Sequence, residues 1–174
     1  MDAARGLGEA LVPALTQANP IIYASDRFAA AARIFKIKIN ENAKTPAFWN
    51  VFPELNHNEM IGWSEIGRSL LSAEALAKAD GEGRTAPHGR FHLVLLRDAD
   101  DHPRVLRRFD VTLALLRETG VSASILPIEG TTLIEKFFAT LLVGDWASYT
   151  LALALGVDPS PVSMVEDLKK RLKE

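Results

Sequence analysis

Residues 20–43 of the chain read PIIYASDRFAAAARIFKIKINENA, and this stretch sets the fold class. Its first part, residues 20–24, is a continuous apolar run, which indicates a strand buried on both faces. Ser25 is a residue type favoured at helix N-caps, and Asp26 is favoured in a first helical turn. A helix is therefore predicted from about residue 26 to residue 43. A buried strand followed at once by a helix is the unit from which parallel α/β sheets are built.

The same alternation of strand and helix signals continues along the chain. Buried strands are predicted at residues 91–96 and 122–128, with a helix at about 104–119 between them. The inner stripe of that helix is expected to consist of Val105, Phe109, Leu113 and Leu116, with Gly120 as its stop. We therefore predict an α/β fold, a three-layer α/β/α sandwich with a mostly parallel sheet wound as in flavodoxin.

The remaining segments are expected to be helices or loops. Residues 52–59 are predicted as a short helix, and residues 70–89 as a short helix followed by an exposed loop. A long apolar helix is expected to open at Gly130–Thr131 and to stop near Gly156, and residues 161–172 to form a last amphipathic helix. Residues 1–19 read as a linker-like helix that precedes a domain at residues 20–174.

Composition narrows the classes of function. The 174 residues carry a net charge of −2, with 48% hydrophobic and 24% charged residues, which is typical of a soluble globular domain. A net charge so close to zero creates no electrostatic field that would attract the whole chain to nucleic acid or to an anionic membrane. The chain has no cysteine, which excludes disulfides, thiolate nucleophiles and cysteine-ligated zinc and fits a cytoplasmic protein.

Two segments bear on export and membrane insertion. The N-terminus lacks a basic start followed by an apolar block, so it is a poor secretory signal. Residues 137–155 are apolar enough to suggest a membrane span but contain Asp145, whose burial in lipid would be costly. A buried core helix is therefore expected there, and no membrane partner.

Residues 39–63, INENAKTPAFWNVFPELNHNEMIGW, hold an unusual density of groups that exchange protons or form hydrogen bonds. Glu41 lies near the end of the first predicted helix, and His57 stands between two asparagines in E-L-N-H-N-E. From the residues alone, Glu41 reads as a solvated helix-end carboxylate. His57 could be a surface loop histidine, or an acid–base group whose tautomer is fixed by the flanking amides.

The blocks N-E-N-A-K and N-H-N-E resemble the signature of the second sugar-isomerase (SIS) domain of bifunctional phosphoglucose/phosphomannose isomerases. The resemblance runs from about residue 20 to residue 173, and residues 144–172 look like the common tail of such domains. It implies isomerisation of glucose 6-phosphate or mannose 6-phosphate to fructose 6-phosphate through an enediolate, which needs neither a metal nor a redox cofactor. It also implies a homodimer with the active site at the interface.

The resemblance assigns a role to three residues. Glu41 would be the base that carries the proton between C2 and C1, and His57 the ring-opening group that reaches the site of the other subunit. Lys136, in T-T-L-I-E-K, would assist proton transfer or stabilise the enediolate. The alternatives for Lys136 are a place on an exposed helix face or a pairing with Glu135 or Asp145.

Other polar residues have simpler interpretations. Thr131 and Thr132 could bind an anionic substrate group through hydroxyl and backbone N–H groups at a helix start, or could equally be N-caps. His88, His92 and His102 are expected to be structural. The segment Gly81-Glu82-Gly83 is expected to be a surface turn and Lys169-Lys170-Arg171 a solvated helix end.

One departure from the family is large. Its members are about twice this length, and their first SIS domain supplies a Ser/Thr-rich loop that binds the sugar phosphate, often after a Gly-x-Ser-Gly turn. No Gly-x-Ser-Gly occurs in this chain. We expect the catalytic C-terminal half of an isomerase, with weak or no activity alone. The alternatives are a non-catalytic SIS module that binds a sugar phosphate or mediates dimerisation, and an isomerase of another sugar phosphate.

Overall fold

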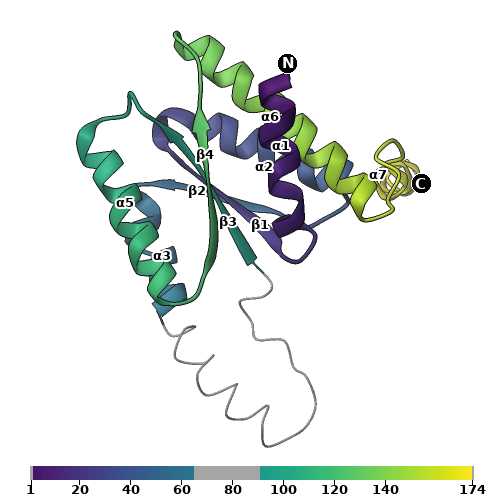
Figure 1. The fold of residues 1–174 in the computed structure, drawn as a ribbon. Coiled ribbons are helices and arrows are strands. Elements are labelled where there is room, and N and C mark those ends of the chain that lie inside the picture. Colours follow the sequence, from purple (N-terminus) through teal and green to yellow (C-terminus); the bar gives the residue numbers. More distant parts are fainter. Residues whose placement is uncertain (1, 65–90, 174) are drawn as a thin grey trace, which may run out of the picture.

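A four-stranded parallel sheet forms the centre of the molecule (Figure 1). The computed structural model describes residues 2–64 and 91–173. The strands are β1 (Asn19–Ser25), β2 (Phe48–Phe52), β3 (Phe91–Asp98) and β4 (Ser122–Ile128), and their order in the sheet is β2-β1-β3-β4. The fully parallel pairing confirms the predicted α/β class.

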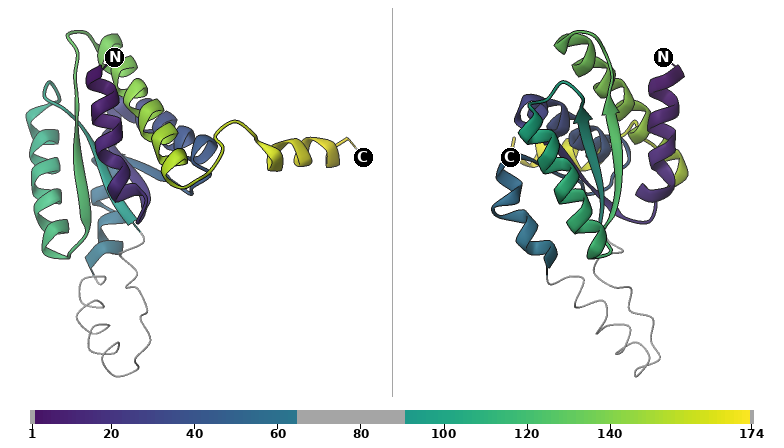
Figure 2. Two further views of the ribbon diagram at one scale, coloured as in Figure 1. Left: turned by 45° about the vertical axis from the view of Figure 1, so that its right-hand side comes forward. Right: turned by 60° about the vertical axis from the view of Figure 1, so that its left-hand side comes forward.

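Helices cover both faces of this sheet (Figures 1 and 2). They are α1 (Asp2–Leu15), α2 (Ala29–Asn42), α3 (Glu59–Ser64), α5 (Pro103–Glu118), α6 (Leu133–Ala154) and α7 (Ser163–Arg171), with short 3-10 turns η1 (Asp26–Phe28) and η2 (Glu54–Asn56). One face carries α1, α2 and α6, and the other carries α3 and α5. The predicted three-layer sandwich is confirmed.

The strands alternate their side chains between two separate hydrophobic cores. Ile22, Val94 and Leu96 pack on the α1/α2/α6 side. Tyr23 and Leu95 pack on the opposite side, against α3 and α5. Both faces are buried because helices cover both, which explains why β1 and β3 read as continuous apolar runs.

The first predicted helix starts differently from the prediction. Ser25 was expected to cap it, but Ser25 is the last residue of β1, is 3% exposed and forms no side-chain cap bond. The turn η1 follows, and α2 begins only at Ala29. Ser25 therefore occupies the predicted N-cap position, before the turn η1, but its buried hydroxyl forms no cap hydrogen bond.

Strand β2 was not predicted. A helix was expected at residues 52–59, whereas Phe52 ends β2, η2 follows, and α3 begins at Glu59. As an edge strand, β2 exposes Phe48 and Trp49 and contains Asn50, so it has no continuous apolar run. The prediction for residues 70–89 lies outside the described residues.

The later helices end close to the positions predicted from the sequence. Both α5 and α6 are followed by a glycine with a left-handed backbone, Gly120 at φ 77° and Gly156 at φ 68°. The last helix, α7, forms where it was expected but has no buried residue, and it projects away from the body (Figure 2).

Helix α6 is held between two neighbours. Gly8 of α1 meets α6 so closely that an added Cβ would lie 2.8 Å from the backbone N of Ala147. Among the helices that the structure describes, α6 is the one whose length and apolar composition would suit a membrane span. Its packing against α1 and α2 favours the core-helix interpretation.

Candidate functional site

Glu41 lies in the last turn of α2 and is exposed. Its carboxylate forms no hydrogen bond or ion pair with any other described residue. The turn that carries it is nevertheless fixed: Asn42 donates to the hydroxyl of Ser148 in α6 at 2.8 Å. Lys44, in a left-handed conformation at φ 54°, donates to the carbonyls of Glu41 and Pro159. The result is a free carboxylate on a rigid helix end.

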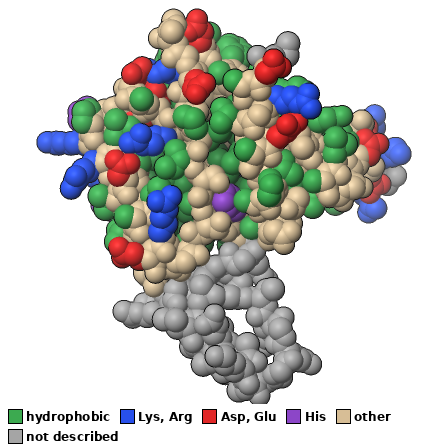
Figure 3. Space-filling model, in the orientation of Figure 1, with side chains coloured by type: hydrophobic (Ala, Val, Ile, Leu, Met, Phe, Trp, Pro, Cys, Tyr) green, Lys and Arg blue, Asp and Glu red, His purple; other side chains and the backbone are tan. Residues whose placement is uncertain are grey.

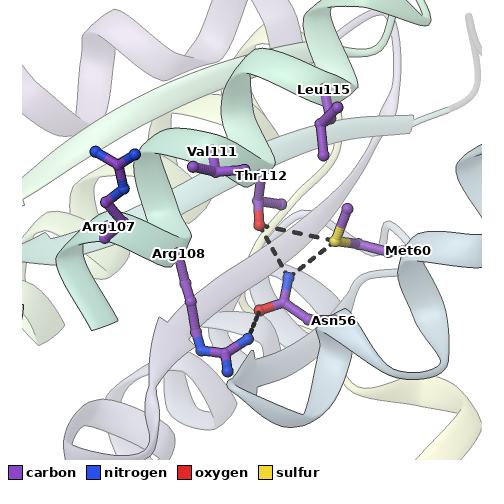
Figure 4. Close-up of a pocket in the computed structure, with 7 residues that line it drawn as sticks. All are labelled: Asn56, Met60, Arg107, Arg108, Val111, Thr112 and Leu115. Atoms are coloured by element: carbon purple, nitrogen blue, oxygen red, sulfur yellow. Dashed lines mark hydrogen bonds between the residues drawn. The ribbon is translucent and has the colours of Figure 1, made fainter. Parts of the chain in front are cut away.

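His57 follows η2 and is also exposed. Its ring forms no hydrogen bond with the described residues. The amide of Asn56 instead contacts Thr112 and Met60 (Figure 4), and that of Asn58 contacts Glu54. The prediction that the flanking amides fix the tautomer of His57 is therefore wrong, because these amides hold the backbone around it.

The structure does not bring Glu41 and His57 together in one copy of the chain. Helix α2 leaves the carboxyl end of β1 and returns toward the start of β2, so Glu41 lies at the amino edge of the sheet. His57 follows the carboxyl end of β2, and its neighbours Leu55 and Asn56 pack on the α3/α5 face. The length of β2, roughly 16 Å, and the thickness of the sheet separate the two residues.

Lys136 occupies a third place, in the first turns of α6 near the carboxyl ends of the strands, as expected. It is 4% exposed and donates to Asp98 Oδ1 and Asp100 Oδ2 at 2.5 Å each. Arg27 donates to the other oxygen of Asp98 at 3.1 Å. Hydrogen bonds to Asp100 and Asp98 raise the pKa of Lys136.

These contacts correct the alternatives considered for Lys136. It lies on no exposed face and pairs with neither Glu135 nor Asp145, whose carboxylate contacts Lys38. Lys136 is also far from Glu41 within one copy. Ser148, which contacts Asn42, is twelve residues further along α6, and this corresponds to about 18 Å of helix axis.

Thr131 and Thr132 are engaged within the helix start. Thr132 is the N-cap of α6 in a capping box with Glu135, so the N-cap alternative is confirmed for this residue. The backbone N–H of Thr131, its hydroxyl and the backbone N–H of Thr132 all donate to Glu135 Oε2. These bonds, the hydroxyl of Thr131 first, lower the pKa of Glu135. A substrate anion would have to displace this carboxylate.

The other singled-out residues have structural contacts. His92 is buried between the hydroxyls of Ser122 and Ser124, and His102 caps α5 by accepting from the N–H of Arg104. Lys169 and Arg171 form ion pairs within α7. His88 and residues 81–83 lie outside the described residues. Within residues 2–64 and 91–173, no cluster of three or more His, Cys, Asp or Glu could hold a metal ion.

A network that the sequence did not reveal surrounds Glu59. Tyr23 donates its hydroxyl to Glu59 Oε1 at 2.5 Å, and Asn50 donates its amide to Glu59 Oε2. Trp63 donates its ring N–H to the Tyr23 oxygen at 3.1 Å. Burial, together with the bond to Glu59, raises the pKa of Tyr23 far above its usual range. Nothing in the local pattern of β2 indicated that Asn50 would face Glu59.

A hollow of about 260 Å³, lined by Asn56 and Met60 among others, lies between α5 and the η2–α3 segment (Figure 4). Its rim carries Arg107 and Arg108, and the guanidinium of Arg108 donates to Asn56 Oδ1 at 3.3 Å. Figure 3 shows basic side chains gathered on the side of the molecule where α5 lies. The spacing of Arg104, Arg107 and Arg108 on one helical face was the sequence signal for this basic surface.

The fold is shared with enzymes that act on sugar phosphates. A glucose-6-phosphate isomerase-like protein from Thermus thermophilus superposes with a TM-score of 0.63 at 17% identity, over 96% of this chain and 46% of that one. This likeness shows the fold class, an α/β domain with a parallel sheet between two helical layers.

The family is more specific than the class. The model of the bacterial phospho-glucose isomerase C-terminal SIS domain matches residues 6–172, and the chain belongs to this family. Two proteins named bifunctional phosphoglucose/phosphomannose isomerase are each 32% identical to it. The one from Aquifex aeolicus matches over 89% of this chain and 42% of its own length, and the one from Caldicellulosiruptor bescii over 98% and 45%. The chain therefore spans less than half the length of these relatives.

Proposed function

We propose that the chain is the catalytic C-terminal half of an isomerase that converts glucose 6-phosphate, mannose 6-phosphate or both into fructose 6-phosphate. The observation that carries the proposal is the free carboxylate of Glu41, held on a fixed helix end inside the N-E-N-A-K block. The relatives' name, bifunctional phosphoglucose/phosphomannose isomerase, supports the substrate class.

The chemistry follows from two proton transfers. An acid–base group first opens the sugar ring by moving a proton between the ring oxygen and the anomeric hydroxyl, a role suited to the exposed imidazole of His57. A carboxylate then removes the proton from C2, leaving an enediolate, and returns it to C1. Glu41 is proposed for this step, and the reaction needs no redox cofactor.

Two copies of the chain are proposed to share each site. Glu41 and His57 lie at opposite edges of the sheet and on opposite sides of it, so a single copy cannot place both against one sugar. A homodimer in which each copy lends His57 to the site of the other resolves this separation. We propose a cytoplasmic enzyme without nucleic-acid or membrane partners.

We propose only an electrostatic role for Lys136. Two carboxylates and a raised pKa hold it protonated, so it is suited to act as a fixed positive charge and not as a proton carrier. Thr131 and Thr132 are proposed as substrate-binding groups only if Glu135 moves away. We propose that the first SIS half, which lies outside this chain, supplies most of the contacts that bind the phosphate.

A coupled assay of fructose 6-phosphate formation tests the proposal, with glucose 6-phosphate and mannose 6-phosphate as substrates. We expect weak or no turnover from the chain alone and full turnover from a protein that carries both halves. In that protein Glu41→Gln should lower kcat by about 10³-fold or more while substrate still binds. Glu118→Gln, another exposed glutamate at a helix end, is the matched control.

The possible outcomes separate the alternatives. Retained turnover in Glu41→Gln would remove the assignment of the base. Absence of turnover with both halves present would favour a non-catalytic SIS module that binds a sugar phosphate or mediates dimerisation.

A further inference from the structure

His57 is exposed, yet the chain on both sides of it is anchored in the protein. Leu55, two residues before it, is 0% exposed, and Trp63, six residues after it, is 6% exposed. Between these two core residues, the backbone N–H of His57 donates to the carbonyl of Glu54 at 2.9 Å. The imidazole therefore projects from a short segment whose ends cannot move independently.

The anchor before His57 is Asn56. Its amide donates to the hydroxyl of Thr112 at 2.9 Å and lies 2.9 Å from the sulfur of Met60, while its oxygen accepts from Arg108 (Figure 4). These contacts fix η2 to the middle of α5.

The anchor after His57 is Glu59. Each of its two carboxylate oxygens accepts one bond, from Tyr23 of β1 and from Asn50 of β2. The hydroxyl of Tyr23 in turn accepts from Trp63. Tyr23 is 0% exposed, so the network reaches from the sheet interior to the start of α3, two residues from His57. A half-buried carboxylate with both oxygens bonded to the sheet is a strong constraint on the start of α3.

We propose that Glu59 is a positioning residue for His57, acting with Asn56 to hold the imidazole at a defined height above the end of β2. This inference rests on the proposed role of His57 in ring opening. Both carboxylate oxygens of Glu59 are engaged by Tyr23 and Asn50, so its proposed action on the sugar is through His57. Its contribution is to keep the general acid–base group in the position that the reaction needs. Displacement of such a group by about 1 Å can lower the reaction rate by about 10²-fold.

The test compares Glu59→Gln with Asn50→Asp/Glu59→Gln in a protein that carries both halves. In the single variant, the new amide NH₂ group at position 59 cannot accept from Asn50, so one anchor bond is lost. In the double variant, the new carboxylate at position 50 accepts from the amide at position 59, which restores both the bond and the charge of the pair. We expect kcat to fall by about tenfold or more in Glu59→Gln with KM within about twofold, and to recover in the double variant.

Two further variants isolate the effect. Glu118→Gln, an exposed glutamate at the end of α5 and outside this network, is the matched control and should leave kcat unchanged. Tyr23→Phe keeps the Glu59 charge and removes its other bond, so it replaces Glu59→Gln if that variant does not fold.

A spectroscopic readout separates this inference from the proposed function. The ring ¹³C–¹H signal of His57, assigned by its loss in His57→Gln, should broaden or shift in Glu59→Gln and return in the double variant. An unaltered His57 signal, or a kcat within about twofold of wild type in Glu59→Gln, would overturn the positioning role. If His57→Gln leaves turnover unchanged, the proposed function of His57 fails, whereas the His57 signal still decides whether Glu59 holds the ring.

Discussion

Lys136 and Lys169 are both helical lysines paired with carboxylates, but only Lys136 is buried. Its partner Asp98 is 0% exposed, whereas Lys169 pairs with Glu166 on the exposed surface of α7. Removing one member of a buried pair leaves an uncompensated charge, and an exposed pair contributes little.

Lys136→Met should therefore lower the midpoint of thermal unfolding by several degrees, because Asp100 loses the Lys136 ammonium and the buried Asp98 keeps only Arg27 as a cationic partner. Lys169→Met should change the midpoint very little. Thermal unfolding followed by circular dichroism measures both. Equal effects of the two substitutions would mean that the buried pair contributes nothing to stability.

His92 gives a prediction for the pH dependence of stability. Burial lowers the pKa of His92 below its ordinary value of 6.5. Below pH 6.5 the unfolded chain binds this proton more readily than the folded one, so the free energy of unfolding should fall as pH decreases. The slope from this group is at most about 1.4 kcal/mol per pH unit.

Urea unfolding between about pH 7.5 and about pH 5 measures this slope. His92→Gln should remove the contribution, whereas His102→Gln, which changes an exposed histidine, should keep it. A slope that survives in His92→Gln would assign the effect to other groups.

At the scale of single elements, the contact between α1 and α6 depends on one glycine. A Cβ on Gly8 would lie 2.8 Å from atoms of α6, while Gly6 in the same helix has nothing within 4 Å. We expect Gly8→Ala to lower the free energy of unfolding by about 1–3 kcal/mol, because α1 must move off α6. Gly6→Ala should raise it by about 0.5–1 kcal/mol through helix propensity.

Chemical denaturation of the two variants checks this pair. Stabilisation by both substitutions would show that α1 does not pack closely on α6. Because α1 lies at the start of the chain, the comparison also tells whether residues 1–19 belong to the domain core or act only as a linker.

The elements differ in how well the sequence predicted them. Strands β1 and β3 were predicted because burial on both faces produces apolar runs, and the ends of α5 and α6 because glycines mark them. Strand β4 was predicted from its shorter apolar segment, although it is a partly exposed edge strand. Strand β2 was missed because an edge strand needs no such run. Ser25 takes the predicted N-cap position, but it is buried and forms no side-chain cap bond, and the regular helix begins only at Ala29.

The candidate site could be predicted only in part. Glu41 and His57 were singled out by short motifs, and both are exposed, as a substrate-facing group must be. The partners of Lys136, by contrast, come from the end of β3 and the turn after it, 38 and 36 residues away, and the partners of Glu59 from two strands. Such contacts depend on the sheet order, which residue spacing does not determine.

At the scale of the whole molecule, the sheet separates Glu41 from His57, and this separation motivates the proposed assembly. One copy holds a free carboxylate at the amino edge and an exposed imidazole beyond the carboxyl end of β2. We therefore propose that the two groups serve one sugar across an interface between copies, so that each active site is shared.

Mixing two inactive variants tests this claim most directly. Protein that carries both halves is prepared as Glu41→Gln and as His57→Gln, and the two are mixed and allowed to exchange subunits. In a mixed dimer one site combines both substitutions and the other is intact, so an equal mixture should regain about a quarter of wild-type turnover. A mixture that stays as inactive as its components, despite exchange confirmed by mass spectrometry, would contradict the shared site.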